Sequence, residues 1–132
     1  MSREADERAI LEVLEKYKET IHTQNEDDFR KIWSQNRECT LISIRRAFHG
    51  LDSIVDDFLI DGIHKAYTKI DLISESVSIN LIEPDAAIIV FGYHTDSIRR
   101  ESGEPYGIQG LETQVMIKED GKWKLVHIHY SK

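Results

Sequence analysis

Two histidines near the carboxyl end of the chain have a type and spacing that could serve chemistry. His127 and His129 are two residues apart in a strand-like run, Lys122 to Tyr130, that follows an Asp120-Gly121 turn. Because side chains of a strand alternate between its faces and each residue rises about 3.3 Å, the two imidazoles share one face, roughly 6.5 to 7 Å apart. That spacing suits two ligands of one metal ion or two polar groups of a pocket.

A metal site would need at least a third ligand. Neighbouring strands could supply only Glu112 or His94, and no partner lies close in sequence, so we predict no metal and no cofactor. The competing interpretation is a pocket in which a histidine and Glu112 act as hydrogen-bond partners or as acid and base, since burial raises the pKa of a carboxyl group. A structural alternative also stands, in which one histidine packs in the core and Glu112 pairs with a cation.

Aromatic side chains could complete such a pocket, although each also fits an ordinary hydrophobic core. The residues that we predict to line the pocket are Tyr17, Trp33, Tyr93, Glu112, Gln114, His127 and His129. The sequence contains no glycine-rich phosphate loop, no Gly-x-Ser-x-Gly motif and no His-Glu-x-x-His motif. It therefore favours no particular reaction and assigns no catalytic residue.

The bulk composition limits the classes of function. The 132 residues suit a single domain spanning 1–132, and 40% hydrophobic with 31% charged residues is ordinary for a globular protein. With 17 Lys and Arg against 24 Asp and Glu, the net charge of -7 argues against nucleic acid and anionic membranes as partners. The single cysteine, Cys39, and the lack of an apolar leader or membrane span lead us to expect a cytoplasmic protein.

Three helices are predicted in the first half of the chain. Apolar residues spaced by three and four predict helices over about Arg3 to His22, Glu26 to Trp33 and Leu51 to Ile63. Ser2 and Asn25 precede the first two and can cap them.

Strands are predicted for most of the remainder. The expected extended segments are Glu38 to Ile44, Arg46 to His49, Ile70 to Ile82, Ala86 to Ser97, Tyr106 to Lys118 and Lys122 to Tyr130. Gly, Pro and Asp residues separate the last four, which indicates consecutive hairpins and an antiparallel meander. Helices followed by such a meander predict an α+β domain with its helices on one face of the sheet.

The order of elements and a set of short motifs resemble a known family. The matching residues are Asp85-Ala86-Ala87, Gly103-Glu104-Pro105, Gln109, Glu112-Thr113, Val115, Asp120-Gly121-Lys122-Trp123 and Val126-His127-Ile128-His129-Tyr130-Ser131, with Phe48-His49-Gly50-Leu51-Asp52 as a weaker match. The chain resembles the nuclear transport factor 2-like fold, which includes SnoaL-like and ketosteroid isomerase-like proteins. It is more similar to the association, or hub, domain of calcium/calmodulin-dependent protein kinase II and its stand-alone bacterial relatives.

This resemblance implies a cone-shaped domain in which a strongly curved antiparallel sheet wraps around the helices and a pocket opens inside the cone. It also implies self-association through the sheet, as a homodimer or a larger ring. The chain departs from the kinase hub, whose pocket carries arginines on the strands that here hold Tyr93 and Gln114. It also lacks the full isomerase set, for which only Tyr17 is a candidate.

Which side chains of the last two strands point inward decides which residues line the pocket and which form the interface. Val126, Ile128 and Tyr130 form the apolar second face of the last strand, and we predict that a second copy of the chain buries it. On the strand before it, Leu111, Thr113, Val115 and Ile117 form the more apolar face, yet the resemblance turns Glu112 and Gln114 inward. A bulge near Gly107 or Gly110 could reconcile these two patterns.

Two hypotheses of function follow. The first is a self-associating domain with a pocket for a small, unidentified molecule. The second is a small enzyme of isomerase, dehydratase or hydrolase type in which Glu112 or His129 transfers a proton. A regulatory partner of a separately encoded kinase is a further alternative by analogy alone.

Overall fold

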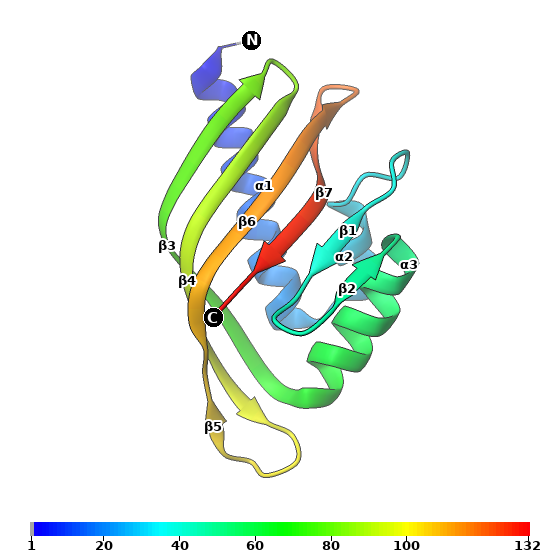
Figure 1. Cartoon of the computed structure of the whole chain (residues 1–132), viewed down its shortest axis with the longest axis vertical. Coiled ribbons are helices and arrows are strands. Elements are labelled where there is room, and N and C mark those ends of the chain that lie inside the picture. Colours follow the sequence, from blue (N-terminus) through cyan, green and yellow to red (C-terminus); the bar gives the residue numbers. More distant parts are fainter. Residues whose placement is uncertain (1) are drawn as a thin grey trace.

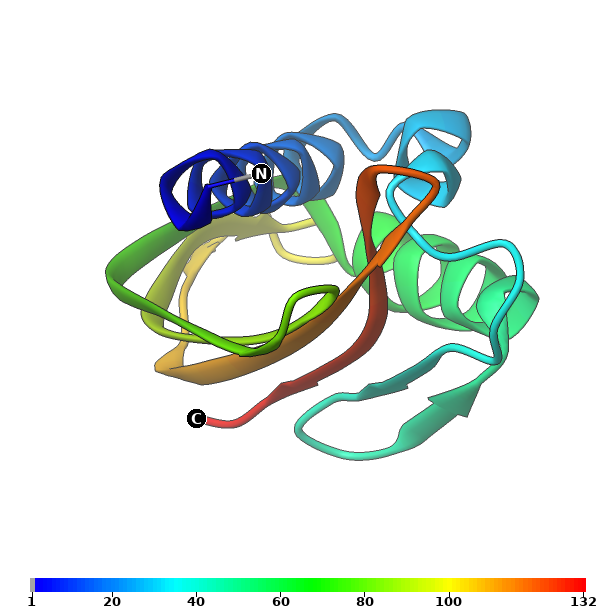
Figure 2. The same cartoon turned by 90° about the horizontal axis from the view of Figure 1, so that it is seen from above.

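The computed structural model describes residues 2–132, in which helices lie on the concave side of one curved sheet (Figure 1, Figure 2). The helices are α1 (Arg3–Thr23), α2 (Glu26–Lys31), α3 (Leu51–Ser53) and η1 (Ile54–His64). The strands are β1 (Thr40–Ile42), β2 (Ala47–His49), β3 (Tyr67–Glu83), β4 (Ala86–Arg99), β5 (Pro105–Tyr106), β6 (Gln109–Glu119) and β7 (Lys122–Tyr130). The predicted α+β class and the curved sheet around amino-terminal helices are confirmed.

Helix α1 is the long helix inside the curve of the sheet. The Ser2 hydroxyl accepts a hydrogen bond from the Ala5 N–H, as its capping role predicts, and Gln24 ends the helix in a left-handed conformation. The predicted apolar stripe is buried, at Ile10, Leu14, Tyr17 and Ile21. Burial of this stripe against the sheet holds α1 in place, since few single helices are stable alone.

The amino end of α1 is tied to the β6–β7 hairpin by a cluster of polar bonds. The Asp6 carboxylate accepts hydrogen bonds from the Lys118 ammonium, at 2.9 Å, and from the Trp123 indole N–H, at 3.2 Å. The bonds from Lys118 and Trp123 lower the pKa of Asp6 below its ordinary value. This cluster fixes the start of α1 against the end of the sheet at which β6 turns into β7.

The third predicted helix, Leu51 to Ile63, is present but more widely wound than expected. It starts as the short α3 and continues as η1, in which backbone hydrogen bonds join residues five apart, as from the Lys65 N–H to the Ile60 carbonyl. Such wide turns are rare and frequently lie at functional sites. No helix in the described part of the chain combines the length and apolarity needed to cross a membrane.

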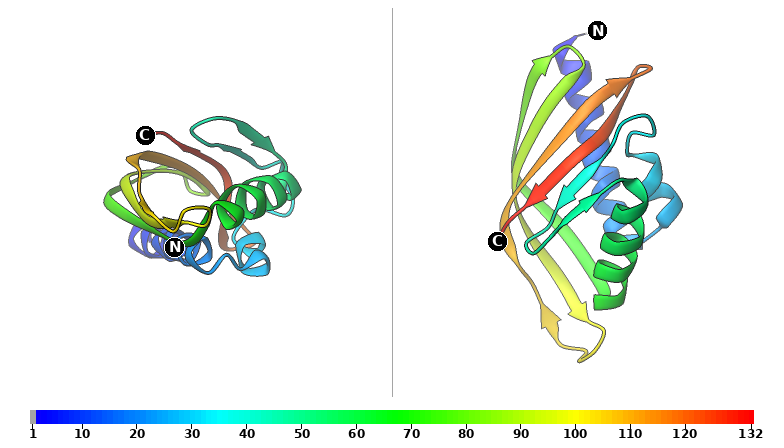
Figure 3. Two further views of the ribbon diagram at one scale, coloured as in Figure 1. Left: turned by 90° about the horizontal axis from the view of Figure 1, so that it is seen from below. Right: turned by 45° about the vertical axis from the view of Figure 1, so that its right-hand side comes forward.

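The seven strands form a single sheet whose order is β2-β1-β7-β6-β4-β3, with β5 added beside β4. The strands from β3 onward make the predicted antiparallel meander, and the β4–β5 hairpin projects beyond the body of the molecule (Figure 3). The parallel pairing of β1 with β7 was not predicted. It places the β1–β2 hairpin beside the last strand, next to η1.

The bulge near Gly107 or Gly110 that could have reconciled the two patterns is absent from the described strands. Ser97 pairs with Tyr106, and His94 pairs with Gln109. Both strands advance by three residues between these two pairs, so β5 and β6 keep one register against β4 across the segment that separates them. The glycines serve close approach instead, because a Cβ on Gly110 would lie 2.0 Å from the Ser131 carbonyl oxygen.

The bulge of this region lies on β7. Met116 pairs with Leu125 but its neighbour Val115 pairs with His127, so Val126 is an extra residue in the ladder. The extra residue reverses which side chains face the helices beyond it. Before the bulge Trp123 and Leu125 are buried, and after it Ile128 is buried.

Candidate functional site

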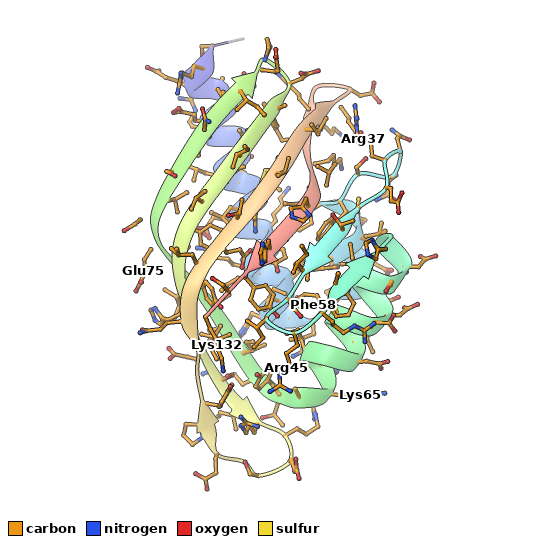
Figure 4. All side chains as sticks on the ribbon, in the orientation of Figure 1. Arg37, Arg45, Phe58, Lys65, Glu75 and Lys132 are labelled. Atoms are coloured by element: carbon orange, nitrogen blue, oxygen red, sulfur yellow. The ribbon has the colours of Figure 1, made fainter. Side chains whose placement is uncertain are left out.

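A cavity of about 100 Å³ lies between α1, η1 and the concave face of the sheet. Its lining residues are Tyr17, Ile21, Ile44, Phe58, Ile63, Tyr67, Ile70, Leu72, Tyr93, Thr95, Tyr106, Ile108, Glu112 and Tyr130. In Figure 4 Phe58 points from η1 toward this interior, whereas Lys65 and Glu75 point outward. A wider groove of about 800 Å³, between α1, α2 and the β6–β7 turn, is lined mostly by polar and charged side chains and holds no buried ionisable group.

Glu112 is the one carboxyl group on the wall of the cavity, and it is only 2% exposed. The described lining contains no lysine, arginine or histidine that could neutralise it. The side-chain amide of Gln114 donates a hydrogen bond of 2.8 Å to Oε2 of Glu112. Burial raises the pKa of Glu112 to about 8, although the Gln114 bond opposes the rise, so the carboxyl group is mostly neutral at pH 7.

Five tyrosines line the same cavity, from α1, β3, β4, β5 and β7: Tyr17, Tyr67, Tyr93, Tyr106 and Tyr130. The Tyr93 hydroxyl donates a 2.7 Å hydrogen bond to the Ser131 carbonyl, and its ring lies edge-on to Tyr130. Burial raises the pKa of Tyr93 to about 12 and that of Tyr17 well above its ordinary value. At neutral pH these two side chains are therefore neutral hydroxyl groups.

The structure brings together Tyr17, Tyr93 and Glu112 from the predicted set. Gln114 lies two residues after Glu112 on β6 and does not line the cavity itself, but it donates a hydrogen bond to Glu112, which does. The side-chain carbonyl of Gln114 has no hydrogen-bond partner among the described residues. The prediction that Trp33 lines the pocket is wrong. Its ring packs 5.9 Å from that of Phe29, which separates it from Tyr17.

The prediction that His127 and His129 line the pocket is also wrong. Both project from the convex face of the sheet, where His129 is exposed and His127 Nδ1 lies 2.6 Å from the Thr40 hydroxyl. The cause is the bulge at Val126, since an unbroken alternation from Trp123 and Leu125 would have put both imidazoles inside. Glu112 and the two histidines lie on opposite faces and cannot bind one metal ion.

The prediction that Val126, Ile128 and Tyr130 form an external dimer surface fails for the same reason. Ile128 is fully buried in the core, and Tyr130 lines the cavity and packs against Phe58. The convex face carries a different apolar set. Its members on β4 and β6 are Ile88, Val90, Leu111, Thr113, Val115 and Ile117, here called the outer sheet face.

Sequence reasoning missed Tyr106 and Tyr130 as lining residues of the cavity, along with the wall from η1, and named Tyr67 only among the aromatic residues that could line it. Tyr130 could have been found, because it lies on the same face of its strand as Ile128, opposite two polar imidazoles. Tyr67 and Tyr106 stack on each other across β3 and β5, with ring centres 6.2 Å apart. No local pattern marks that long-range contact.

Comparison with known structures identifies the fold as nuclear transport factor 2-like. A nuclear transport factor 2-like superfamily protein from Salmonella enterica serovar Typhimurium LT2 superposes with a TM-score of 0.93 at 24% identity, covering 98% of this chain and 92% of that one. A hexachlorocyclohexane dehydrochlorinase from Novosphingobium barchaimii LL02 gives 0.85 at 13% identity, over 97% and 86% of the two chains. Identities this low establish the shared fold and no shared activity.

Two further comparisons concern one family within this fold, and the sequence profile is the one that establishes it. A candidate calcium/calmodulin dependent protein kinase II association domain from Xanthomonas campestris superposes with a TM-score of 0.78 at 18% identity, over 94% of this chain and 85% of that one. No curated protein sequence matches the chain. The profile of the calcium/calmodulin dependent protein kinase II association domain matches residues 6–132, nearly the whole sequence. The chain therefore belongs to the calcium/calmodulin-dependent protein kinase II association-domain family.

Proposed function

We propose that this chain is a self-associating domain whose concave side holds a pocket for a small molecule. The main support for a ligand-binding pocket is that Glu112 is buried on the wall of a cavity whose described lining contains no cation. Burying a polar group without full compensation costs stability, so such groups are uncommon in walls that serve packing alone. A mostly apolar cavity with a few convergent polar groups is the usual form of a small-molecule site.

Methyl resonances of the protein test this pocket directly. Benzene, titrated into protein carrying ¹³C-labelled methyl groups, should produce saturable shifts at Ile21, Ile70 and Leu72, which line the cavity. The methyl groups of Ile82, half exposed near the end of β3, provide the control and should not shift. Absence of saturable shifts at the lining residues, for benzene and for smaller hydrocarbons alike, would remove the basis of the pocket.

Self-association is supported by the outer sheet face. Leu111 is 60% exposed there, and Val115 lies between Ile88 of β4 and His127 of β7 in the register of the sheet. An exposed, contiguous apolar patch on a sheet is the kind of surface that a second copy of the chain covers in a symmetric dimer. Membership of an association-domain family agrees with this. Sedimentation velocity at micromolar concentration tests it, and a strict monomer would contradict it.

A second candidate function is a small enzyme of isomerase, dehydratase or hydrolase type. Glu112 favours it, because a neutral buried acid can give a proton or a hydrogen bond to a substrate oxygen. His129 cannot contribute from the outside of the sheet. Proteins of this fold include a hexachlorocyclohexane dehydrochlorinase, a candidate scytalone dehydratase and a candidate ketosteroid isomerase. Loss of turnover in a stable Glu112→Gln variant would support this function, and no turnover on a broad panel of carbonyl compounds would oppose it.

A further inference from the structure

The orientation of the Glu112 carboxyl group determines what it offers to the cavity. Its Oε2 atom accepts the hydrogen bond from the Gln114 amide, which itself is fully buried on the same strand. The second oxygen, Oε1, has no such bond within the described residues. When the carboxyl group is neutral, the amide bond to Oε2 favours the proton on Oε1.

The groups that face Glu112 do not compete for its proton. From the elements around the cavity they are the hydroxyls of Tyr17, Tyr67, Tyr93, Tyr106 and Tyr130, together with Thr95. The Tyr93 hydroxyl already donates to the Ser131 carbonyl, which orients it away from the role of a free donor. No charged residue other than Glu112 occurs in the described lining, so no group there would hold the carboxyl group ionised.

The remaining wall is apolar and the space is small. Seven hydrocarbon side chains of the wall, on α1, η1, β3 and two turns, offer no hydrogen bond: Ile21, Ile44, Phe58, Ile63, Ile70, Leu72 and Ile108. A cavity of about 100 Å³ approaches the ~150 Å³ that accepts benzene in an engineered protein core. A single five- or six-membered ring is therefore the largest guest that we expect it to take.

We infer that the cavity takes a neutral, compact ring or short-chain molecule with one oxygen acceptor, of which a small ketone is the simplest example, with that oxygen against Oε1 of Glu112. The inference rests on the proposed function and adds the class of ligand to it. An anionic ligand would meet no cation in this wall. A cationic ligand would first require Glu112 to lose its proton, at a cost that falls as the pH rises.

Matched ligands that differ by one atom test this assignment. Cyclopentanone and methylenecyclopentane have nearly the same shape, but only the ketone accepts a hydrogen bond. By calorimetric or NMR titration at pH 6.5, the ratio of ketone to hydrocarbon affinity should be about tenfold higher for the wild-type protein than for Glu112→Leu, the value of one net hydrogen bond. At pH 9.5, where Glu112 is ionised, this gain should disappear because the donor is lost.

Two variants at the same position separate hydrogen bonding from packing. Glu112→Leu offers no hydrogen bond and should favour the hydrocarbon to the same extent at both pH values. Glu112→Gln carries an N–H donor that does not titrate, so the ketone preference should become independent of pH. Circular dichroism and thermal melts at both pH values establish that each variant is folded before binding is compared.

The outcomes also distinguish this inference from the proposed function. A ketone-to-hydrocarbon affinity ratio no higher for the wild-type protein than for Glu112→Leu would overturn the inference and leave the pocket intact. Tighter binding of tetramethylammonium than of the ketone at pH 6.5 would overturn it in favour of a cationic ligand. Preference for pyrrole, a donor, over cyclopentanone would also overturn it. If none of these probes binds, the proposed pocket itself fails.

Discussion

The side-chain amide of Gln114 donates a 2.8 Å hydrogen bond to the carboxyl group of Glu112, two residues earlier on the concave face of β6. Both side chains are buried, and no cation in the described wall lies against the carboxyl group. Burial raises the pKa of Glu112 to about 8, while the Gln114 bond lowers it. The pair is thus neutral under ordinary conditions, and the stability of the fold becomes linked to pH.

The free energy of unfolding should fall as the pH rises from about 5 to 8. Glu112 has a pKa near 4.5 when exposed and about 8 when folded, so between these values the folded state binds the extra proton. The expected loss is at most about 1.4 kcal/mol per pH unit. Urea denaturation of the wild-type protein and Glu112→Gln, from pH 5 to pH 8, measures it.

In that experiment the Glu112→Gln variant should not show this loss, because its side chain does not titrate. Glu83→Gln, which removes an exposed carboxylate at the end of β3, is the control and should follow the wild-type curve. A stability difference between wild type and Glu112→Gln that stays constant with pH would refute the raised pKa.

Gly110→Ala should destabilise the protein by roughly 1–3 kcal/mol, the usual cost of inserting a group where packing has no space. The added methyl group would lie 2.0 Å from the Ser131 carbonyl oxygen, which also accepts the hydrogen bond of Tyr93. Gly92→Ala, on the adjacent strand β4, is the matched control, since its Cβ would meet the Glu75 carbonyl oxygen at an ordinary 3.6 Å. Equal thermal melting temperatures for the two variants would contradict this role of Gly110.

Val115→Lys should weaken self-association at least about tenfold. An ammonium group placed in the middle of the outer sheet face would be buried without a partner, at a cost above the 1.4 kcal/mol that corresponds to this factor. Leu11→Lys places the same charge at another exposed leucine, on α1, and should leave association unchanged. Sedimentation equilibrium of the three proteins gives the constants, and equal values for wild type and Val115→Lys would exclude this face as the interface.

Asp6→Asn should lower the thermal melting temperature at pH 7 by weakening the bonds to Lys118 and Trp123. Because these bonds lower the pKa of Asp6, the stability they give is present above the unfolded pKa, near 3.8, and is lost as the pH falls through the folded value. The difference from wild type should therefore shrink below about pH 4. Glu4→Gln makes the same charge change in the same helical turn and should show no such pH dependence.

The helices and most strands could be predicted because their patterns are local. Spacings of three and four placed α1, and the caps at Ser2 and Asn25 are as predicted. The direction in which β6 faces could not be read from hydrophobicity, since the sheet buries Glu112 and exposes Leu111. The resemblance predicted the right orientation there, because it placed Glu112 and Gln114 inward, against the hydrophobic pattern of the strand.

The last strand shows the limit of a period-two pattern. The alternation that placed His127 and His129 in the pocket put them on the wrong side, because one extra residue at Val126 changes its phase. A period-two pattern contains no record of a bulge unless glycine or proline marks it. The full lining of the cavity could not be predicted either, since its tyrosines come from five elements that meet only in the folded chain.

The wide winding of η1 has a consequence for the size of the cavity. Phe58 and Ile63 both face the cavity although they are five residues apart, which would place them about 140° apart around an ordinary α-helix. Rewinding this segment to 3.6 residues per turn would rotate Ile63 away from the wall while Phe58 stayed in place. The volume available to a guest molecule thus depends on the pitch of one helix, which can change without moving the sheet or replacing a side chain.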